Sequence, residues 1–328
     1  MTPARLTLLL ASGVLALALL SLLAGPVWLR PAELWNASLG GDQTLASLIL
    51  WQVRLPRTLL ALLVGGTLGL AGAVLQGLLR NPLAEPGLLG ISAGASLGAV
   101  IAIYYGFAAS FALATPLFAL TGALATAGVA LALSRQGGTL SLILAGVAVS
   151  AIAGAGVSLA LNLAPSPFAA YEIMTWLMGS LADRSWDHVL LGGPLMLVGW
   201  LLLATTARAL DSLSLGEATA ESLGVNLSAT RLAALAGTAL AVGAATAVSG
   251  VIGFVGLIAP HLVRPLVRHR PAATLLPSTI TGAGIVLAAD MATRLLRLGT
   301  DVKLGVFIAI FGAPLFLWLV LHVRRTAP

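Results

Sequence analysis

Few residues of this chain could carry out covalent chemistry, and the most recognisable catalytic pattern is a serine between two glycines. Residues 90–94 read Gly-Ile-Ser-Ala-Gly, which matches the G-x-S-x-G pattern of a serine nucleophile, and His261 could serve as its base. That pattern needs a strand, a sharp turn and a helix in succession, whereas here it opens an apolar run. A serine hydrolase that uses Ser92 and His261 is therefore the least favoured of three interpretations, and we predict no catalytic residue.

A second candidate is Asp290, a carboxylic acid near the end of an apolar run. An ionisable residue at such a position is a functional candidate by default. However, Arg294 lies four residues further on, where an ion pair along one helix would neutralise the acid. We favour a structural role for Asp290. The alternative is an ion-coupled secondary transporter in which Asp290 is the coupling acid.

Metal and nucleotide sites are not expected in this chain. It has no cysteine, and no second His or Cys lies at ligand spacing from His261, which more plausibly makes a polar contact at a helix end. The only lysine, Lys303, is followed by Leu304, so there is no Gly-Lys-Ser/Thr motif to hold phosphates. If ATP drives the protein, a separate subunit must bind the ATP.

The composition indicates which elements carry these residues. Of 328 residues, 59% are hydrophobic and 9% are charged, and the mean hydropathy is +1.03. Soluble proteins carry about 25% charged residues, so the surface of this protein must face lipid. Its basic residues are scattered singly between apolar runs, which argues against nucleic-acid binding, because a nucleic-acid binder clusters them on one face.

Ten apolar runs are long enough to be candidate membrane-spanning helices. We therefore predict an all-α polytopic membrane protein with a single transmembrane domain over residues 1–328. The predicted spans cover residues 6–29, 57–79, 88–107, 110–133, 139–162, 189–206, 231–248, 250–264, 272–293 and 304–323, of which the eighth is the weakest.

An even number of spans places both chain ends on the same side of the membrane. A modest excess of arginines in the loops on that side predicts cytoplasmic N- and C-termini. We expect the membrane to be a bacterial inner membrane. Topology leaves the basic residues of two exterior loops unexplained. One loop holds Arg54 and Arg57, and the other holds Arg294, Arg297 and Lys303.

Small residues recur every four positions in two of the spans, which places each set along one helical stripe. The stripes are Gly65, Gly69, Ala73 and Gly77 in the second span, and Gly146, Ser150, Gly154, Ser158 and Asn162 in the fifth. Close helix packing is the favoured interpretation. For the fifth span, the alternative is the wall of a pathway wide enough for a bulky solute.

Two connecting segments have sequence features that a simple turn does not require. Residues 80–87 contain Pro82 and Pro86, which interrupt a helix, and their mixed polarity is compatible with a loop that closes a pore. Residues 211–229 have a weak apolar face and a stop signal at Gly224, which predicts short helices. Such helices could be a mere connector or the contact surface for a soluble motor.

Several stretches, in order along nearly the whole chain, resemble the FecCD family of ABC permeases, and residues 51–95 are especially similar to its vitamin B12 permeases. The matching stretches are Arg54-Leu-Pro-Arg57, Leu75-Gln-Gly77, residues 81–90, Leu144-Ala-Gly-Val147, Trp176-Leu-Met-Gly-Ser180, Leu215-Gly-Glu217, residues 249–264 and residues 312–318.

The resemblance implies a homodimer of ten-helix subunits in the membrane lipid, without enzymatic activity or a bound cofactor of its own. Two ABC ATPase subunits would bind Mg-ATP, and a periplasmic solute-binding protein would deliver the cargo. Members of the family import haem, ferric siderophores or vitamin B12 (cobalamin), and the sequence does not decide among them.

The resemblance also implies roles for particular residues. Docking of the binding protein is expected at Arg54, Arg57, Arg294 and the neighbouring Arg297. ATPase coupling is expected in residues 211–229, at Leu215, Gly216, Glu217, Glu221 and Gly224. The cytoplasmic gate is expected at Asn81, Leu83, Thr139 and Leu140, and the Gly146 to Asn162 stripe would line the pathway.

One stretch departs from the family pattern. Where many relatives have Glu-Leu-Pro-Val-Gly before the last span, this chain has Asp301-Val-Lys303-Leu-Gly305. The acid and the glycine remain, but the proline is lost and a lysine is gained. We expect a local difference in the shape of this exterior loop.

Overall fold

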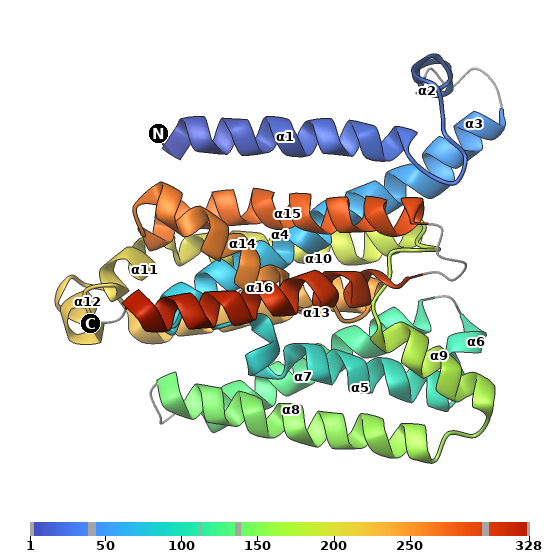
Figure 1. Ribbon diagram of the computed structural model, residues 1–328. Coiled ribbons are helices and arrows are strands. Elements are labelled where there is room, and N and C mark those ends of the chain that lie inside the picture. The colour runs from blue at the N-terminus through green and yellow to red at the C-terminus, as the bar shows by residue number, and fades with distance from the viewer. Residues whose placement is uncertain (1–2, 39–43, 112, 135–138, 297–301, 327–328) are drawn as a thin grey trace.

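The computed structural model describes residues 3–38, 44–111, 113–134, 139–296 and 302–326. Within these ranges the chain consists of helices and turns, without a strand. The start of α1 and the end of α16 lie at the same end of the bundle (Figure 1), as the even number of spans predicts. We call this the termini end and the other the opposite end.

Each of the ten predicted apolar runs contains a helix. Seven helices in the described ranges are long and apolar enough to cross a membrane: α1 (Pro3–Leu23), α4 (Leu55–Leu78), α7 (Ala114–Leu133), α8 (Thr139–Asn162), α10 (Trp186–Thr205), α13 (Leu227–Ser249) and α15 (Pro271–Leu295). The remaining runs contain α5 (Ile91–Tyr104), α14 (Val255–Val263) and α16 (Leu304–Thr326).

Short helices occupy the connections. They are α2 (Pro31–Ser38), α3 (Leu45–Leu48), the π-helix η1 (Ile49–Arg54), the 3₁₀-helices η2 (Pro86–Leu89) and η3 (Arg264–Val267), α6 (Phe107–Ser110), α9 (Pro167–Leu177), α11 (Ala207–Leu213) and α12 (Glu217–Ser222). Helix α9 lies in a stretch that hydropathy alone leaves outside the spans.

The centre of the bundle is the antiparallel pair α4 and α15. A Cβ atom added to Gly65 would lie 2.3 Å from the Gly282 carbonyl oxygen, and one added to Gly69 would lie 2.2 Å from that of Ser278. No side chain fits at these contacts, so the second-span glycines serve close helix packing, as predicted. By contrast, α1 lies along the outside of the bundle (Figure 1) and is mostly exposed.

Two predicted boundaries are wrong. The second span begins well before residue 57, because α3, η1 and α4 form one continuous helical stretch from Leu45 to Leu78. The eighth span is not helical over residues 250–254, and only the nine residues of α14 follow. Gly250 has a φ of +70°, and an added Cβ there would lie 2.4 Å from the Trp176 carbonyl oxygen. The close approach to this neighbouring segment therefore requires glycine and breaks the helix.

Candidate functional site

At the opposite end of the bundle, Asp290 lies between two arginines from different helices. Its carboxylate is fully buried near the end of α15. The Arg57 guanidinium of α4 binds it with Nη2–Oδ1 and Nε–Oδ1 distances of 2.8 and 2.9 Å. Arg294 of α15 binds the second oxygen at 2.7 Å. The predicted pair of Asp290 and Arg294 is confirmed, and Arg57 joins it from a position 233 residues away in the sequence.

The same cluster ties down the end of α1. The Arg294 guanidinium donates to the Ser21 hydroxyl at 2.6 Å and to the Ser21 carbonyl oxygen at 3.2 Å. The Ser21 hydroxyl is in turn 2.9 Å from that of Thr58 in α4. Arg54, which is 4% exposed, donates to the carbonyl oxygens of Leu22 and Val27. Three arginines therefore join α1, α4 and α15, and we name Arg54, Arg57, Asp290 and Arg294 the arginine cluster.

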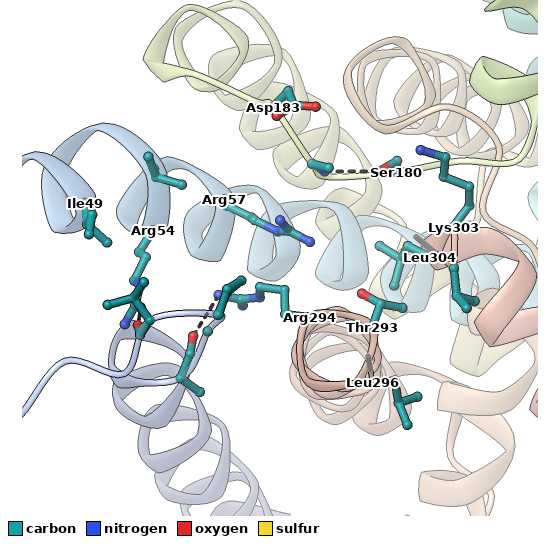
Figure 2. Close-up of a pocket in the computed structure, with 17 residues that line it drawn as sticks. Ile49, Arg54, Arg57, Ser180, Asp183, Thr293, Arg294, Leu296, Lys303 and Leu304 are labelled. Atoms are coloured by element: carbon teal, nitrogen blue, oxygen red, sulfur yellow. Dashed lines mark hydrogen bonds between the residues drawn. The ribbon is translucent and has the colours of Figure 1, made fainter. Parts of the chain in front are cut away.

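The three arginines of the arginine cluster line one side of an open cavity of about 720 Å³. Figure 2 shows Arg54, Arg57 and Arg294 along one side, with Ser180, Asp183 and Lys303 across from them. Among the described lining residues the four basic side chains outnumber Asp183, the single acid. Such a cavity attracts negatively charged groups.

The predicted docking residues are thus brought together, with most of their side chains used internally. Arg54 is buried, the Arg294 side chain is 7% exposed and contacts α1, and Arg57 is held by Asp290. Lys303 lines the cavity without an ion pair among the residues that the structure describes. Docking remains a prediction, and Arg297 lies outside the described residues.

The predicted gate loop turns back into the termini end of the bundle. The Asn81 side-chain oxygen accepts a hydrogen bond from the Leu83 backbone N–H at 2.9 Å, which fixes the turn. The following η2 packs on α8, where an added Cβ on Gly146 would lie 2.3 Å from the Leu88 carbonyl oxygen. Thr139 and Leu140 form the first turn of α8. The predicted gate segments therefore belong to neighbouring elements, while the gate role itself remains a prediction.

Glu85 in this loop was not singled out from the sequence. Burial raises the pKa of its carboxyl group above the ordinary value, and a hydrogen bond with the Phe254 backbone opposes the shift. Phe254 precedes α14 with a left-handed φ of +65°. The loop before η2 is thus anchored to the unwound segment before α14 by a partly buried acid.

The small-residue stripe of α8 does not face a single environment. Gly146 is buried against η2, whereas Gly154, Ser158 and Asn162 are exposed. A spacing of four advances about 40° per step around a helix of 3.6 residues per turn, so the stripe winds from the interior to the outer surface. Only its later half could line a pathway outside this chain, and that role remains a prediction.

The segment at residues 211–229 begins in the last turn of α11 and contains the whole of α12, which confirms the expected short helices. Gly224 ends α12 with a φ of +83°, as its position predicts. Glu217 pairs with Arg231 at 3.0 Å. The side chains of Leu215 and Leu223 are 65% and 62% exposed. This connector therefore presents apolar side chains outward at the termini end.

The remaining candidates have structural explanations. The glycines of the Ser92 pattern start and pack α5: Gly90 precedes the helix with a φ of +78°, and Gly94 lies against Thr126 of α7. No described hydrogen bond joins Ser92 and His261. In the part of the chain that was searched, no three His, Cys, Asp or Glu side chains form a possible metal site. Asp290, with two guanidinium groups around it, gives the ion-coupled alternative no support.

Some site residues carry weak sequence signals. Arg184 lines a second cavity of about 280 Å³ at the opposite end, and burial lowers the pKa of its side chain. Helix α9, which contributes to that cavity, begins at the Ser166-Pro167 dipeptide, and the Ser166 hydroxyl accepts from the Ala169 N–H. A capping serine followed by proline is a recognised helix start and could have revealed α9.

An apolar helical bundle with a basic cavity at one end and an exposed helical connector at the other is typical of a transport subunit. Comparison with known families identifies the kind of transport subunit. The model of the FecCD transport family matches residues 13–322. The chain belongs to this family. It is an ABC importer permease, a transport subunit that spans the membrane many times.

FecCD relatives match almost the whole chain. The vitamin B12 import system permease protein BtuC of Klebsiella pneumoniae is 40% identical over 97% of this chain and 93% of its own length. The hemin transport system permease protein HmuU of Yersinia pestis is also 40% identical, over 94% and 93%.

The fold of this chain is similar to that of a solved structure. That structure, presented as an inward-facing conformation of a metal-chelate type ABC transporter, is 32% identical, with a TM-score of 0.83 over 97% of this chain and 99% of the other. The relatives differ in cargo at equal identity, so family membership does not select one.

Proposed function

We propose that this permease forms a homodimer in the bacterial inner membrane and imports a large metal chelate by alternating access, with its termini end in the cytoplasm. The candidate cargoes are haem, a ferric siderophore and cobalamin. The observation that carries the proposal is the match to BtuC and HmuU over more than nine tenths of the chain. BtuC and HmuU are named for vitamin B12 and hemin, and each of these compounds is a metal ion held by an organic ligand.

In this proposal, each end of the bundle binds a different partner protein. At the opposite end, the basic cavity beside the arginine cluster would receive acidic groups of a periplasmic solute-binding protein. At the termini end, the connector of α11 and α12 would contact an ABC ATPase through Leu215 and Leu223. Binding and hydrolysis of Mg-ATP in two such subunits would then open and close the pathway between the two copies of the permease.

Uptake into proteoliposomes tests the proposal. The permease is reconstituted with an ATPase and a solute-binding protein from the same organism, and haem, a panel of ferric siderophores and cobalamin are supplied in turn. We expect uptake of one cargo that requires both ATP and the binding protein. Uptake that continues without ATP and follows an ion gradient would refute the proposal.

A connector variant adds a sharper test. Leu215→Asp places a charge on the exposed apolar surface of the connector, so ATPase binding and uptake should fall together. Ala4→Asp, which is also exposed and at the termini end but lies outside residues 211–229, is the matched control. Equal losses in both variants would argue against a contact at Leu215.

A further inference from the structure

A second basic cavity lies at the termini end, far from the arginine cluster. Its volume is about 280 Å³, and it lies between the end of α4, the start of α15 and η3. Three basic side chains from separate segments line it: Arg80 after α4, Arg264 in η3, and His269 after η3. The ATPase connector touches it only through Ser214.

The charge of this cavity is uncompensated by the residues that the structure describes. None of its lining residues is Asp or Glu. The described ion pairs do not include Arg80, Arg264 or His269. The nearby acid Asp211 is engaged elsewhere, since its two oxygens accept from the Arg270 guanidinium at 3.1 Å and from the Ala272 backbone N–H at 2.8 Å.

Arg264 is held in place by a buried amide. Gln76 is 3% exposed, and its side chain donates to the Gly256 carbonyl oxygen at 3.1 Å while its oxygen accepts from the Arg264 guanidinium. This contact uses one of the five N–H donors of the guanidinium. The half-buried arginine is therefore positioned before any ligand arrives.

The other two basic residues have left-handed backbones. The φ angles of Arg80 and His269 are +48° and +58°, and that of the adjacent Arg268 is +56°. Such angles are uncommon outside glycine. Three of the five non-glycine residues with positive φ in the described ranges thus lie at or beside one small cavity.

We propose that this cavity binds a phosphate group. Arginine guanidinium groups match phosphate oxygens with paired hydrogen bonds, and an imidazole N–H adds a further donor. Basic cavities between helices at the membrane surface are known to hold lipid headgroups. The phosphate could therefore belong to an anionic phospholipid or to a free anion, and the chemistry of recognition is the same.

The test uses the full-length permease, stripped of lipid in a neutral detergent. Inorganic phosphate is titrated by calorimetry, and phosphatidylglycerol binding is counted by native mass spectrometry against phosphatidylcholine. We expect one of the two phosphate probes to bind, and Arg80→Gln and His269→Gln each to weaken it about tenfold. Both side chains are exposed, and thermal unfolding without either probe checks that the fold is retained.

Arg208→Gln is the matched control, because Arg208 is an exposed arginine at the same end that does not line the cavity. Binding of phosphatidylglycerol alone assigns the cavity to a lipid headgroup, and binding of inorganic phosphate assigns it to a free anion. Absence of both, or equal weakening by the control, overturns the proposal. So does an outcome in which Arg80→Gln weakens only the association with the ATPase, since the cavity would then receive a protein side chain.

Discussion

At the scale of single residues, the most informative contact is that of Asp290 with Arg57 and Arg294. A buried ion pair stabilises the folded state little more than an apolar pair of similar size would. Removing one partner, however, is costly because it leaves the other charge buried and unpaired. Here one carboxylate serves two guanidinium groups, of which Arg294 is almost fully buried. The loss of Asp290 therefore affects three helices at once.

We expect Asp290→Ala to lower the free energy of unfolding by about 3–5 kcal/mol, because it leaves two guanidinium groups without their carboxylate. Thermal and denaturant unfolding of the purified permease would measure this loss. Glu172→Ala, an exposed acid at the same end, should change the free energy by less than about 0.5 kcal/mol. Similar values for both variants would show that the cluster does not stabilise the fold.

Glu85 gives a prediction about pH. Its pKa is raised in the folded state, so the folded protein binds the proton more tightly than the unfolded chain does. Stability from this group is fully present below the ordinary pKa of glutamate and is lost as the pH rises through the raised value. Glu85→Gln should therefore remove part of the decline in melting temperature across that range. An unchanged pH profile would contradict the assignment.

At the scale of helices, the glycine contacts between α4 and α15 decide how closely the two can approach. Gly282→Ala would place a methyl group 2.3 Å from the Gly65 carbonyl oxygen, which belongs to backbone and cannot move aside alone. We expect a loss of about 1–3 kcal/mol of unfolding free energy, in the range for overpacked cores. Gly128→Ala in α7 meets nothing within 4 Å and should be neutral or slightly stabilising. Denaturant unfolding of the two variants side by side would measure both effects.

Hydropathy predicted the spans because each must be apolar on its own, whatever its neighbours. It could not predict the unwound residues 250–254, since that break depends on the close approach of Gly250 to the Trp176 backbone. The same division holds for the arginine cluster. The i,i+4 pair of Asp290 and Arg294 is local and was predicted, whereas Arg57 enters through the packing of α4 on α15, which no local pattern specifies.

At the scale of the whole molecule, basic groups gather at both ends of an otherwise apolar bundle. The cavity at the opposite end is lined by the three arginines of the cluster and by Lys303, and the one at the termini end is lined by Arg80, Arg264 and His269. Most of the cluster is committed to internal contacts. Lys303 is the lining cation through which a docking partner could be tested without disturbing the fold.

We expect Lys303→Glu to slow association with the binding protein several-fold, and more at low salt, because charged groups at a rim mainly steer the encounter. Surface plasmon resonance at two salt concentrations would measure the rates. Arg30→Glu, an exposed charge reversal outside the cavity, is the control. A slower association in both variants alike would reflect overall charge instead of a docking site.

The close packing of α4 against α15 has a mechanical consequence. Helix α15 has 25 residues, about 37 Å of rise, with Asp211 holding its first turn and Asp290 holding the arginines near its last. At the glycine contacts the two backbones touch directly, so there are no intervening side chains whose rearrangement could absorb a displacement of one helix along the other. We therefore expect the two helices to move as one rigid unit, so that a shift of α11 against the start of α15 is transmitted along the length of the pair.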